Sequence, residues 1–294
     1  MTRPTRPVLR WHGGKWKLAP WILRHFPPHR VYVEPFGGAA SVLLRKERSY
    51  AEVYNDLDDH IVGLFRVLQD DCKAEQLVSR LYLTPFSRRE FDLAWEAADN
   101  EIEQARRLVI RSFMGFGSNA HNVELGRGAT GFRADSTKSG STPAHDWSRY
   151  PASLYSIVER MRGVVIEHRP ALQIMTKHDG PNVLHYVDPP YMHETRGLKN
   201  KHDPKHLYRY ELSAEDHQQL LSVLAELKGM VVLSGYPTEL YDEMLRGWSR
   251  VETKALADGA RARTEVLWIN PAAATALRTH RGGSHMPLFA EIRP

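Results

Sequence analysis

The chain has 294 residues, of which 42% are hydrophobic and 26% are charged, and this composition excludes an intrinsically disordered protein. The single cysteine excludes an intrachain disulfide framework, and the chain contains no run of eighteen apolar residues that would predict a membrane span. Residues 1–14 lack the apolar stretch of a secretory signal, so we expect a cytoplasmic protein without a membrane partner. The formal net charge is +5, with seven basic and no acidic residues in 1–33 and nine basic against four acidic residues in 105–163, which favours a polyanionic partner such as nucleic acid.

The N-terminal region contains a glycine-rich segment flanked by an aromatic and a cationic side chain, Trp11-His12-Gly13-Gly14-Lys15. Lys15 is suited to pair with a carboxylate of a small ligand, and Trp11 offers a stacking face. The alternative is that these residues only decorate a basic N-terminal arm.

Two strands are predicted next, at 31–34 and 51–54. The turn after the first contains Gly37 and Gly38, which let a ligand approach the backbone, although the dinucleotide fingerprint is not matched. Asp56 follows the second strand, nineteen positions after Gly37, close to the offset at which an acid meets ribose hydroxyls. This pattern fits an adenosine-type ligand without a pyrophosphate, and tight strand-to-helix packing is the alternative.

Helical spacing predicts a short helix over 42–46 and a longer one over 57–68. With the two strands, they give a β-turn-α-β-α order that implies a parallel sheet with crossover helices.

The middle of the chain has a different pattern. Ser87 and Glu90 form a capping-box pattern, and a second helix is predicted over 101–113. Residues 115–143 contain six glycines and little apolar periodicity. Because a structureless loop of this length is uncommon unless it binds something, we expect a functional insertion over roughly 63–161. A surface insertion without function is the alternative.

Alternation of strands and helices then returns. Ser213 and Asp216 predict the start of a helix that runs to Lys228, with Gly229 in the favoured stop position. Further strands are predicted at 163–167, 183–187, 230–233 and 265–269.

The strongest chemical signal follows the strand at 183–187. Asp188-Pro189-Pro190-Tyr191 stands where the carboxyl end of a parallel strand meets its ligand. The prolines keep the chain extended and stiff, so a carboxylate, a fixed carbonyl and an aromatic ring lie within four residues. This set suits a planar base with an amino group, which donates its N–H groups to the acid and the carbonyl while the ring stacks on it. A proline-rich strand exit with a surface aspartate is the alternative.

These motifs, in this order, resemble the Dam-like adenine-specific DNA methyltransferases, the group in which cofactor motifs precede the recognition insertion and the catalytic tetrapeptide follows it. The resemblance covers about 10–68 and 163–271. It implies an α/β fold with a Rossmann-like methyltransferase sheet that carries helices on both faces. It further implies a catalytic domain of 1–62 and 162–294, with an inserted, mostly helical and loop target-recognition domain of 63–161.

The implied reaction moves a methyl group from S-adenosyl-L-methionine to the exocyclic amine of a flipped-out adenine in double-stranded DNA. Hydrogen bonds from the amine to the Asp188 carboxylate and the Pro189 carbonyl would aim the nitrogen lone pair at the methyl group, and Tyr191 would stack on the base. The expected catalytic residues are Asp188, Pro189, Pro190 and Tyr191. The expected cofactor-binding residues are Trp11, Lys15, Glu34, Pro35, Phe36, Gly37, Gly38, Asp56 and Asp188. The expected DNA-binding residues are Arg111, Arg127 and Arg133. A cognate restriction endonuclease is a possible partner of such an enzyme.

The sequence departs from the family pattern in three places. Many members carry a further glycine where Ala39 or Ala40 stands. Pro170 stands where members often carry an acid, so contacts to the cofactor's adenine must come from elsewhere or from main chain. In the insertion, only Gly131-Phe132-Arg133 is reminiscent of the Dam recognition segment, which leaves the target sequence open.

Three alternatives stay open, and no metal is expected. RNA- and glutamine-modifying methyltransferases usually begin the tetrapeptide with asparagine and cytosine amine methyltransferases with serine, so Asp188 favours adenine. A catalytically decayed DNA-binding protein is a second alternative. A nuclease would use Glu226-Leu227-Lys228, for which no Pro-Asp partner precedes at a strand end. The best pair of metal ligands is His202 and His206, with Asp203 between them.

Overall fold

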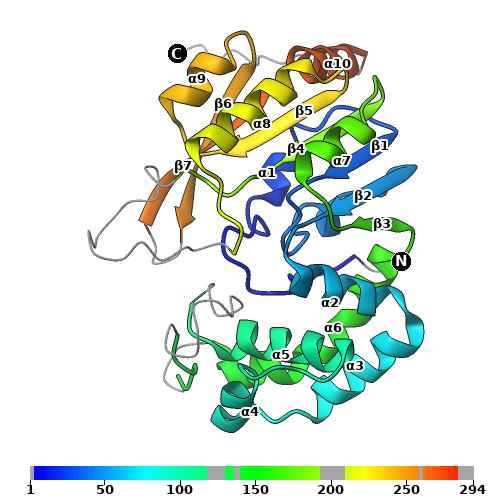
Figure 1. Ribbon diagram of the computed structural model, residues 1–294, viewed down its shortest axis with the longest axis vertical. Helices are drawn as coiled ribbons and strands as arrows, with labels where there is room; N and C mark the ends of the chain where they lie inside the picture. The colour runs from blue at the N-terminus through cyan, green and yellow to red at the C-terminus, as the bar shows by residue number, and fades with distance from the viewer. Residues whose placement is uncertain (1–2, 118–129, 136–139, 193–208, 258–260, 284–294) are drawn as a thin grey trace, which may run out of the picture.

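The computed structural model describes residues 3–117, 130–135, 140–192, 209–257 and 261–283. Its centre is a seven-stranded sheet with the order β3-β2-β1-β4-β5-β7-β6 (Figure 1). The strands are β1 (Val31–Glu34), β2 (Ala51–Asn55), β3 (Val164–Glu167), β4 (Val183–Val187), β5 (Met230–Gly235), β6 (Ser249–Ala257) and β7 (Arg261–Ile269). The α/β class and every predicted strand are confirmed, while β6 was not predicted and β7 begins earlier than expected.

The sheet is parallel from β3 to β5, and β7 runs antiparallel between β5 and β6. β1 pairs with β2 on one side and with β4 on the other. The strands after β1 are added on one side of it as far as β3, and from β4 on they are added on its other side. In open parallel sheets such a switch point leaves a crevice outside the carboxyl ends of the strands. The residues that follow β1, β2 and β4 therefore meet at one edge.

Both faces of the sheet are covered, which explains the continuous apolar runs of the central strands. In β5, Met230 and Val232 belong to one buried cluster with helices α1 and α10, whereas Val231 and Leu233 belong to a second cluster with α7, α8 and α9. The covering helices are α1 (Ala19–Leu23), α7 (Ala171–Lys177), α8 (Ala214–Glu226), α9 (Glu239–Met244) and α10 (Pro271–Gly283). Helices on both faces are therefore confirmed, although α1, α7, α9 and α10 were not predicted.

The other helices lie together beside the β3 end of the sheet (Figure 1). They are α2 (Asp59–Gln69), α3 (Asp71–Leu83), α4 (Arg88–Leu93), α5 (Glu101–Met114) and α6 (Pro143–Met161). Their apolar residues, such as Phe65, Leu108 and Leu154, belong to the same buried cluster as Tyr54 on β2. The helical part therefore shares a core with the sheet. The segment 63–161 as a separate recognition domain stays a prediction.

Capping explains where several helices begin. Ser213 and Asp216 form the predicted capping box of α8, with both reciprocal hydrogen bonds present. At α4, Ser87 accepts from the Glu90 amide, but the Glu90 carboxylate binds Arg106 at 2.9 Å instead of closing the box.

Two local predictions were wrong. Residues 42–46 form only the 3-10 turn η1 (Leu43–Arg45). Helix α8 ends at Glu226, and Gly229 does not adopt the positive φ of a helix stop. A Cβ at Gly229 would lie 3.0 Å from a carboxylate oxygen of Asp179, so close packing, rather than helix termination, accounts for this glycine.

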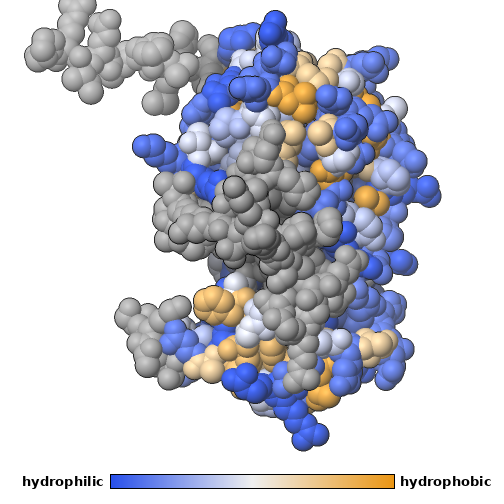
Figure 2. All heavy atoms as spheres, turned by 60° about the vertical axis from the view of Figure 1, so that its left-hand side comes forward, coloured by the Kyte–Doolittle hydropathy of each residue, from blue (hydrophilic) through white to orange (hydrophobic). Residues whose placement is uncertain are grey.

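Hydrophilic side chains dominate the face shown in Figure 2, and the apolar patches are separated. Large apolar side chains that are exposed, such as Tyr50, Tyr82 and Phe116, come from different elements. None of the helices in the described residues has the length and apolar character needed to span a bilayer.

Candidate active site

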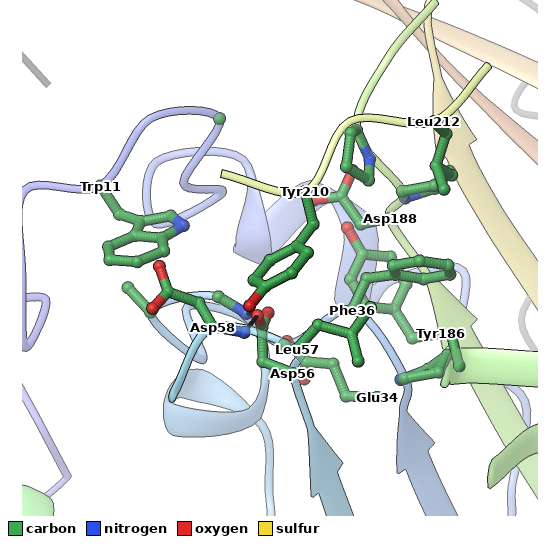
Figure 3. A pocket seen from close by; sticks show the side chains of 18 of the residues that line it. Trp11, Glu34, Phe36, Asp56, Leu57, Asp58, Tyr186, Asp188, Tyr210 and Leu212 are labelled. Atoms are coloured by element: carbon green, nitrogen blue, oxygen red, sulfur yellow. Dashed lines mark hydrogen bonds between the residues drawn. The ribbon is translucent and has the colours of Figure 1, made fainter. Parts of the chain in front are cut away.

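A cavity of about 240 Å³ opens at the carboxyl ends of β1, β2 and β4 (Figure 3). Its lining residues fall within seven parts of the chain, namely 11–15, 34–42, 56–58, 170–172, 186–190, 209–212 and 216–220. The expected cofactor residues and the aspartate of the tetrapeptide thus lie around one cavity, with Asp56 and Asp188 both in its wall.

The glycine turn after β1 is shaped by its aromatic neighbours. A Cβ at Gly37 would overlap the ring of Tyr54, whose hydroxyl donates to the Gly38 carbonyl at 2.7 Å. Gly38 has a φ of +46°, and a Cβ there would lie 2.8 Å from Nε1 of Trp11. The sequence predicts these glycines from ligand approach, and the structure adds a second reason, which is close contact with Tyr54 and Trp11.

Asp56 is held by backbone amides at the bottom of the cavity. Its Oδ2 accepts from the Gly38 amide at 2.7 Å and its Oδ1 from the Asp58 amide at 2.8 Å. Burial raises the pKa of Asp56 to about 6, against the lowering effect of these hydrogen bonds. The carboxylate is therefore mostly ionised at neutral pH and fixed in orientation.

Asn55, completely buried, ties two walls of the cavity together. Its amide nitrogen donates to the carbonyls of Pro35 and Arg169, and its amide oxygen accepts from the Arg169 amide, each at 2.9 Å. The turn that precedes Pro170 is thereby fastened to the turn after β1. This role could not be predicted from the sequence, because the partners are 20 and 114 positions away.

Asp188 forms an ion pair with Lys15 in the wall of the cavity. The Nζ of Lys15 lies 3.0 Å from Oδ1 of Asp188 and donates to the Gly13 carbonyl at 3.0 Å. Burial raises the pKa of Asp188, and the charge of Lys15 offsets part of that effect. Two motifs that are 173 positions apart, from 15 to 188, thus meet through one charge pair.

Glu34 ends β1 and is nearly inaccessible to solvent. It accepts from the Tyr32 hydroxyl at 2.7 Å and from the Leu43 amide at 3.1 Å. Burial raises the pKa of Glu34 to about 8, so this side chain is mostly protonated at neutral pH. The cavity therefore has a neutral acid at Glu34 beside the ionised Asp56.

Tyr191 does not line the cavity, unlike the other members of the tetrapeptide. The ring is 8% exposed, and the Lys15 ammonium lies 4.6 Å from its centroid. The Tyr191 hydroxyl donates to Glu265 at 2.8 Å. Sequence reasoning missed Glu265, which belongs to a strand 74 positions away.

Tyr210 and Arg209, also missed, cross the mouth of the cavity. Figure 3 shows the ring of Tyr210 over the middle of the cavity, between Trp11 and the Asp188 side. Arg209 forms ion pairs with Asp58, at 3.2 Å, and with Asp59. Arg209 thus links this segment to the start of α2.

The three arginines expected to bind DNA differ in their surroundings. Arg111 is 2% exposed and donates to the Ala94 carbonyl inside the helical part, so its burial disfavours a phosphate contact. Arg133 is half-buried and donates to the Phe113 carbonyl at 3.2 Å. Arg127 lies outside the described residues, as do His202, Asp203 and His206. Among the described residues, no group of three potential metal ligands is found.

Comparisons with known proteins agree with this geometry. A family model described as D12 class N6 adenine-specific DNA methyltransferase matches residues 11–258. The chain is 27% identical over 117 residues to a DNA adenine methylase of Vibrio cholerae serotype O1 (39% of this chain, 42% of the relative). Its identity to a DNA adenine methylase of Serratia marcescens is 29% over 112 residues (37% and 40%), and to that of Escherichia coli K12 34% over 67 residues (23% and 24%). The matches therefore span less than half the length of these relatives.

Proposed function

Because the chain belongs to the D12 class N6 adenine-specific DNA methyltransferase family, we propose that it transfers a methyl group from S-adenosyl-L-methionine to the exocyclic amine of adenine in double-stranded DNA. The family expected from the sequence is thereby confirmed. The observation that carries the proposal is the shared cavity, in which the ligand side at Asp56 and the tetrapeptide side at Asp188 face one space.

The residues around the cavity fit the proposed donor. The Asp56 carboxylate, fixed by two amides and mostly ionised, suits the acceptance of hydrogen bonds from ribose hydroxyls. Trp11, Phe36 and Leu172 provide apolar and aromatic walls for a purine ring. Lys15 supplies a cation for the carboxylate of the amino-acid end. When bound, the donor supplies an electrophilic methyl group on a sulfonium.

Asp188 and Pro189 would act on the target amine. The nitrogen of an aromatic amine is a poor nucleophile, because its lone pair is delocalised into the ring. Acceptance of its two N–H bonds by the Asp188 carboxylate and the Pro189 carbonyl favours a pyramidal nitrogen with its lone pair directed at the methyl group. Lys15, 3.0 Å from Asp188, helps to keep that carboxylate ionised despite its burial.

Stacking of the flipped base on Tyr191 stays a prediction. The Lys15 ammonium lies over this ring. A base that stacks there has to displace Lys15 or use the other side of the ring. If the base displaces Lys15, part of the binding free energy of the DNA is spent on moving that side chain. This cost adds to the cost of base flipping, which is about 2–4 kcal/mol.

We further propose that the helical part and the residues 115–143 contact DNA, with Arg127 and Arg133 on phosphates. The basic excess of 105–163 supports this. A cognate restriction endonuclease and a cytoplasmic location remain predictions from the resemblance and the composition.

The direct test is methylation of DNA that lacks modified adenine, followed by single-molecule sequencing. We expect N6-methyladenine within a defined sequence context. Methylation of cytosine, or of RNA but not DNA, would contradict the proposal.

A further inference from the structure

A further buried carboxylate, Glu265, lies beside Tyr191 of the tetrapeptide, on a strand that runs antiparallel to β5. Glu265 belongs to β7, next to Val266, which pairs with Gly235 at the end of β5. Because β7 is antiparallel to β5, its early residues reach the same sheet edge at which β4 and β5 end. Glu265 is thereby brought beside Tyr191, which follows β4.

Glu265 holds the Tyr191 ring by its hydroxyl. Tyr191 donates to Oε2 of Glu265 at 2.8 Å, and its hydroxyl lies 3.3 Å from Oγ of Ser234 on β5. The Lys15 ammonium covers one part of the ring, and Tyr236 packs edge-on with the ring centroids 4.5 Å apart. Tyr191 belongs to no helix or strand, so these side-chain contacts determine its orientation.

The burial of the Glu265 carboxylate costs free energy, because a charge is costly to bury unless it is paired. Glu265 is 6% exposed, and burial raises its pKa, while the nearby charge of Lys15 acts in the opposite direction. A buried charged group adds little to folding stability compared with a well-packed apolar side chain of similar size. We therefore expect Glu265 to contribute to the orientation of Tyr191 rather than to folding stability.

We propose that Glu265 is a positioning residue for methyl transfer, which acts through the hydroxyl of Tyr191 and fixes that ring beside Asp188 and Lys15. This inference rests on the proposed function. Glu265 itself touches neither the cofactor cavity nor the reacting atoms, since it is not among the residues that line the cavity. Its effect is therefore expected on the rate of methyl transfer more than on cofactor affinity.

The test compares Glu265→Leu, Glu265→Gln, Tyr191→Phe and the double variant Tyr191→Phe/Glu265→Leu. Single-turnover methyl transfer is measured with tritiated S-adenosylmethionine and unmethylated genomic DNA, and cofactor affinity by equilibrium dialysis. Glu252→Leu, an exposed carboxylate on the neighbouring strand β6, is the matched control. All variants are compared at equal folded fraction.

We expect Glu265→Leu and Tyr191→Phe each to slow the transfer about tenfold, as for loss of a hydrogen bond to a charged group. The double variant should be no slower than Tyr191→Phe, because loss of the Tyr191 hydroxyl already removes the contact that Glu265→Leu removes. Glu265→Gln should keep most of the rate, since its amide oxygen still accepts from the hydroxyl. Cofactor affinity and the Glu252→Leu rate should stay near wild type.

Multiplying effects in the double variant, or equal loss in Glu265→Gln and Glu265→Leu, would overturn the positioning role. If Glu265→Leu does not fold, Tyr191→Phe and Glu265→Gln still decide: an unchanged rate in Tyr191→Phe, or a rate in Glu265→Gln as low as in Tyr191→Phe, would overturn it. Wild-type protein that transfers no methyl group would instead contradict the proposed function itself.

Discussion

The acidic residues at the strand ends have different charge states because each has different neighbours. Glu34, with a pKa of about 8, is held by a phenol and one amide in a fully buried position. Asp56, with a pKa of about 6, is held by backbone amides. Asp188 is also raised by burial but faces the Lys15 ammonium. One cavity thus combines a neutral acid with carboxylates that are available as acceptors.

The raised pKa of Glu34 predicts a pH-dependent effect of Glu34→Gln on stability. The pKa rises from 4.5 to about 8 on folding, so between these values the unfolded chain has released a proton that the folded protein keeps. The free energy of unfolding of the wild type therefore falls as pH rises through this window. We expect the variant to gain stability relative to wild type at pH 9 compared with pH 5, as measured by urea unfolding at both values. An identical difference at the two pH values would argue against this charge state.

Single residues were predicted where they stand in a local motif and missed where only distant contacts bring them to the site. Lys15, Asp56 and Asp188 stand in recognisable motifs, and the structure places all three at the cavity. Glu265 and Arg209 carry no local signal, because their roles depend on partners brought close only by the folded sheet.

Among the elements, length alone did not decide what was predicted, because the long helices α3, α6 and α10 were missed as well as several short ones. Helix α5 and strand β4 have clear apolar patterns, and both were predicted within about one residue. Helices α7 and α9 have only seven and six residues, too few to show a period of 3.6. Strand β6 lies at the sheet edge beside β7, and its residues 251–255 alternate between intermediate and exposed rather than buried and exposed, so it carries little of the apolar signal by which the other strands were predicted.

The link between the turns after β1 and β3 predicts a stability and affinity effect of Asn55→Ala. The variant leaves polar backbone groups of Pro35 and Arg169 without the amide that they contact. We expect a loss of about 1–3 kcal/mol in the free energy of unfolding and weaker cofactor binding, measured by denaturation and equilibrium dialysis.

Asn100→Ala is the matched control for Asn55→Ala. Asn100 caps α5 in an exposed position away from the cavity, so it should cost about 1 kcal/mol with no change in cofactor affinity. Unchanged cofactor affinity in Asn55→Ala would show that cofactor binding does not depend on the contacts of Asn55 with the two turns.

Across the whole molecule, a buried ion cluster joins the helical part to the sheet. Arg160 on α6 binds both oxygens of Glu52 on β2, at 2.6 and 2.9 Å, and Lys46 lies 3.0 Å from the same carboxylate. Although burial acts to raise it, the pKa of Glu52 is lowered by its hydrogen bonds with Arg160 and Lys46. With the shared apolar core, this cluster fixes the helical part relative to the cavity.

Arg160→Met should therefore destabilise the entire protein. Removal of one partner of a buried charge pair costs about 3–5 kcal/mol, whereas the exposed pair of Arg162 and Asp71 is worth about 0–1 kcal/mol. We expect one cooperative unfolding transition in calorimetry, shifted strongly to lower temperature in Arg160→Met and little in Arg162→Met. Separate transitions for the helical part and the sheet would contradict the shared core.

We propose above that Asp188 acts on the target amine while the Asp56 side of the same cavity holds the methyl donor. The most direct measurement is the single-turnover rate of methyl transfer to DNA by Asp188→Ala, with the dissociation constant of S-adenosylmethionine determined on the same protein. We expect a rate at least about a hundredfold below wild type, with donor affinity changed only slightly. A variant that retains the wild-type rate would contradict it.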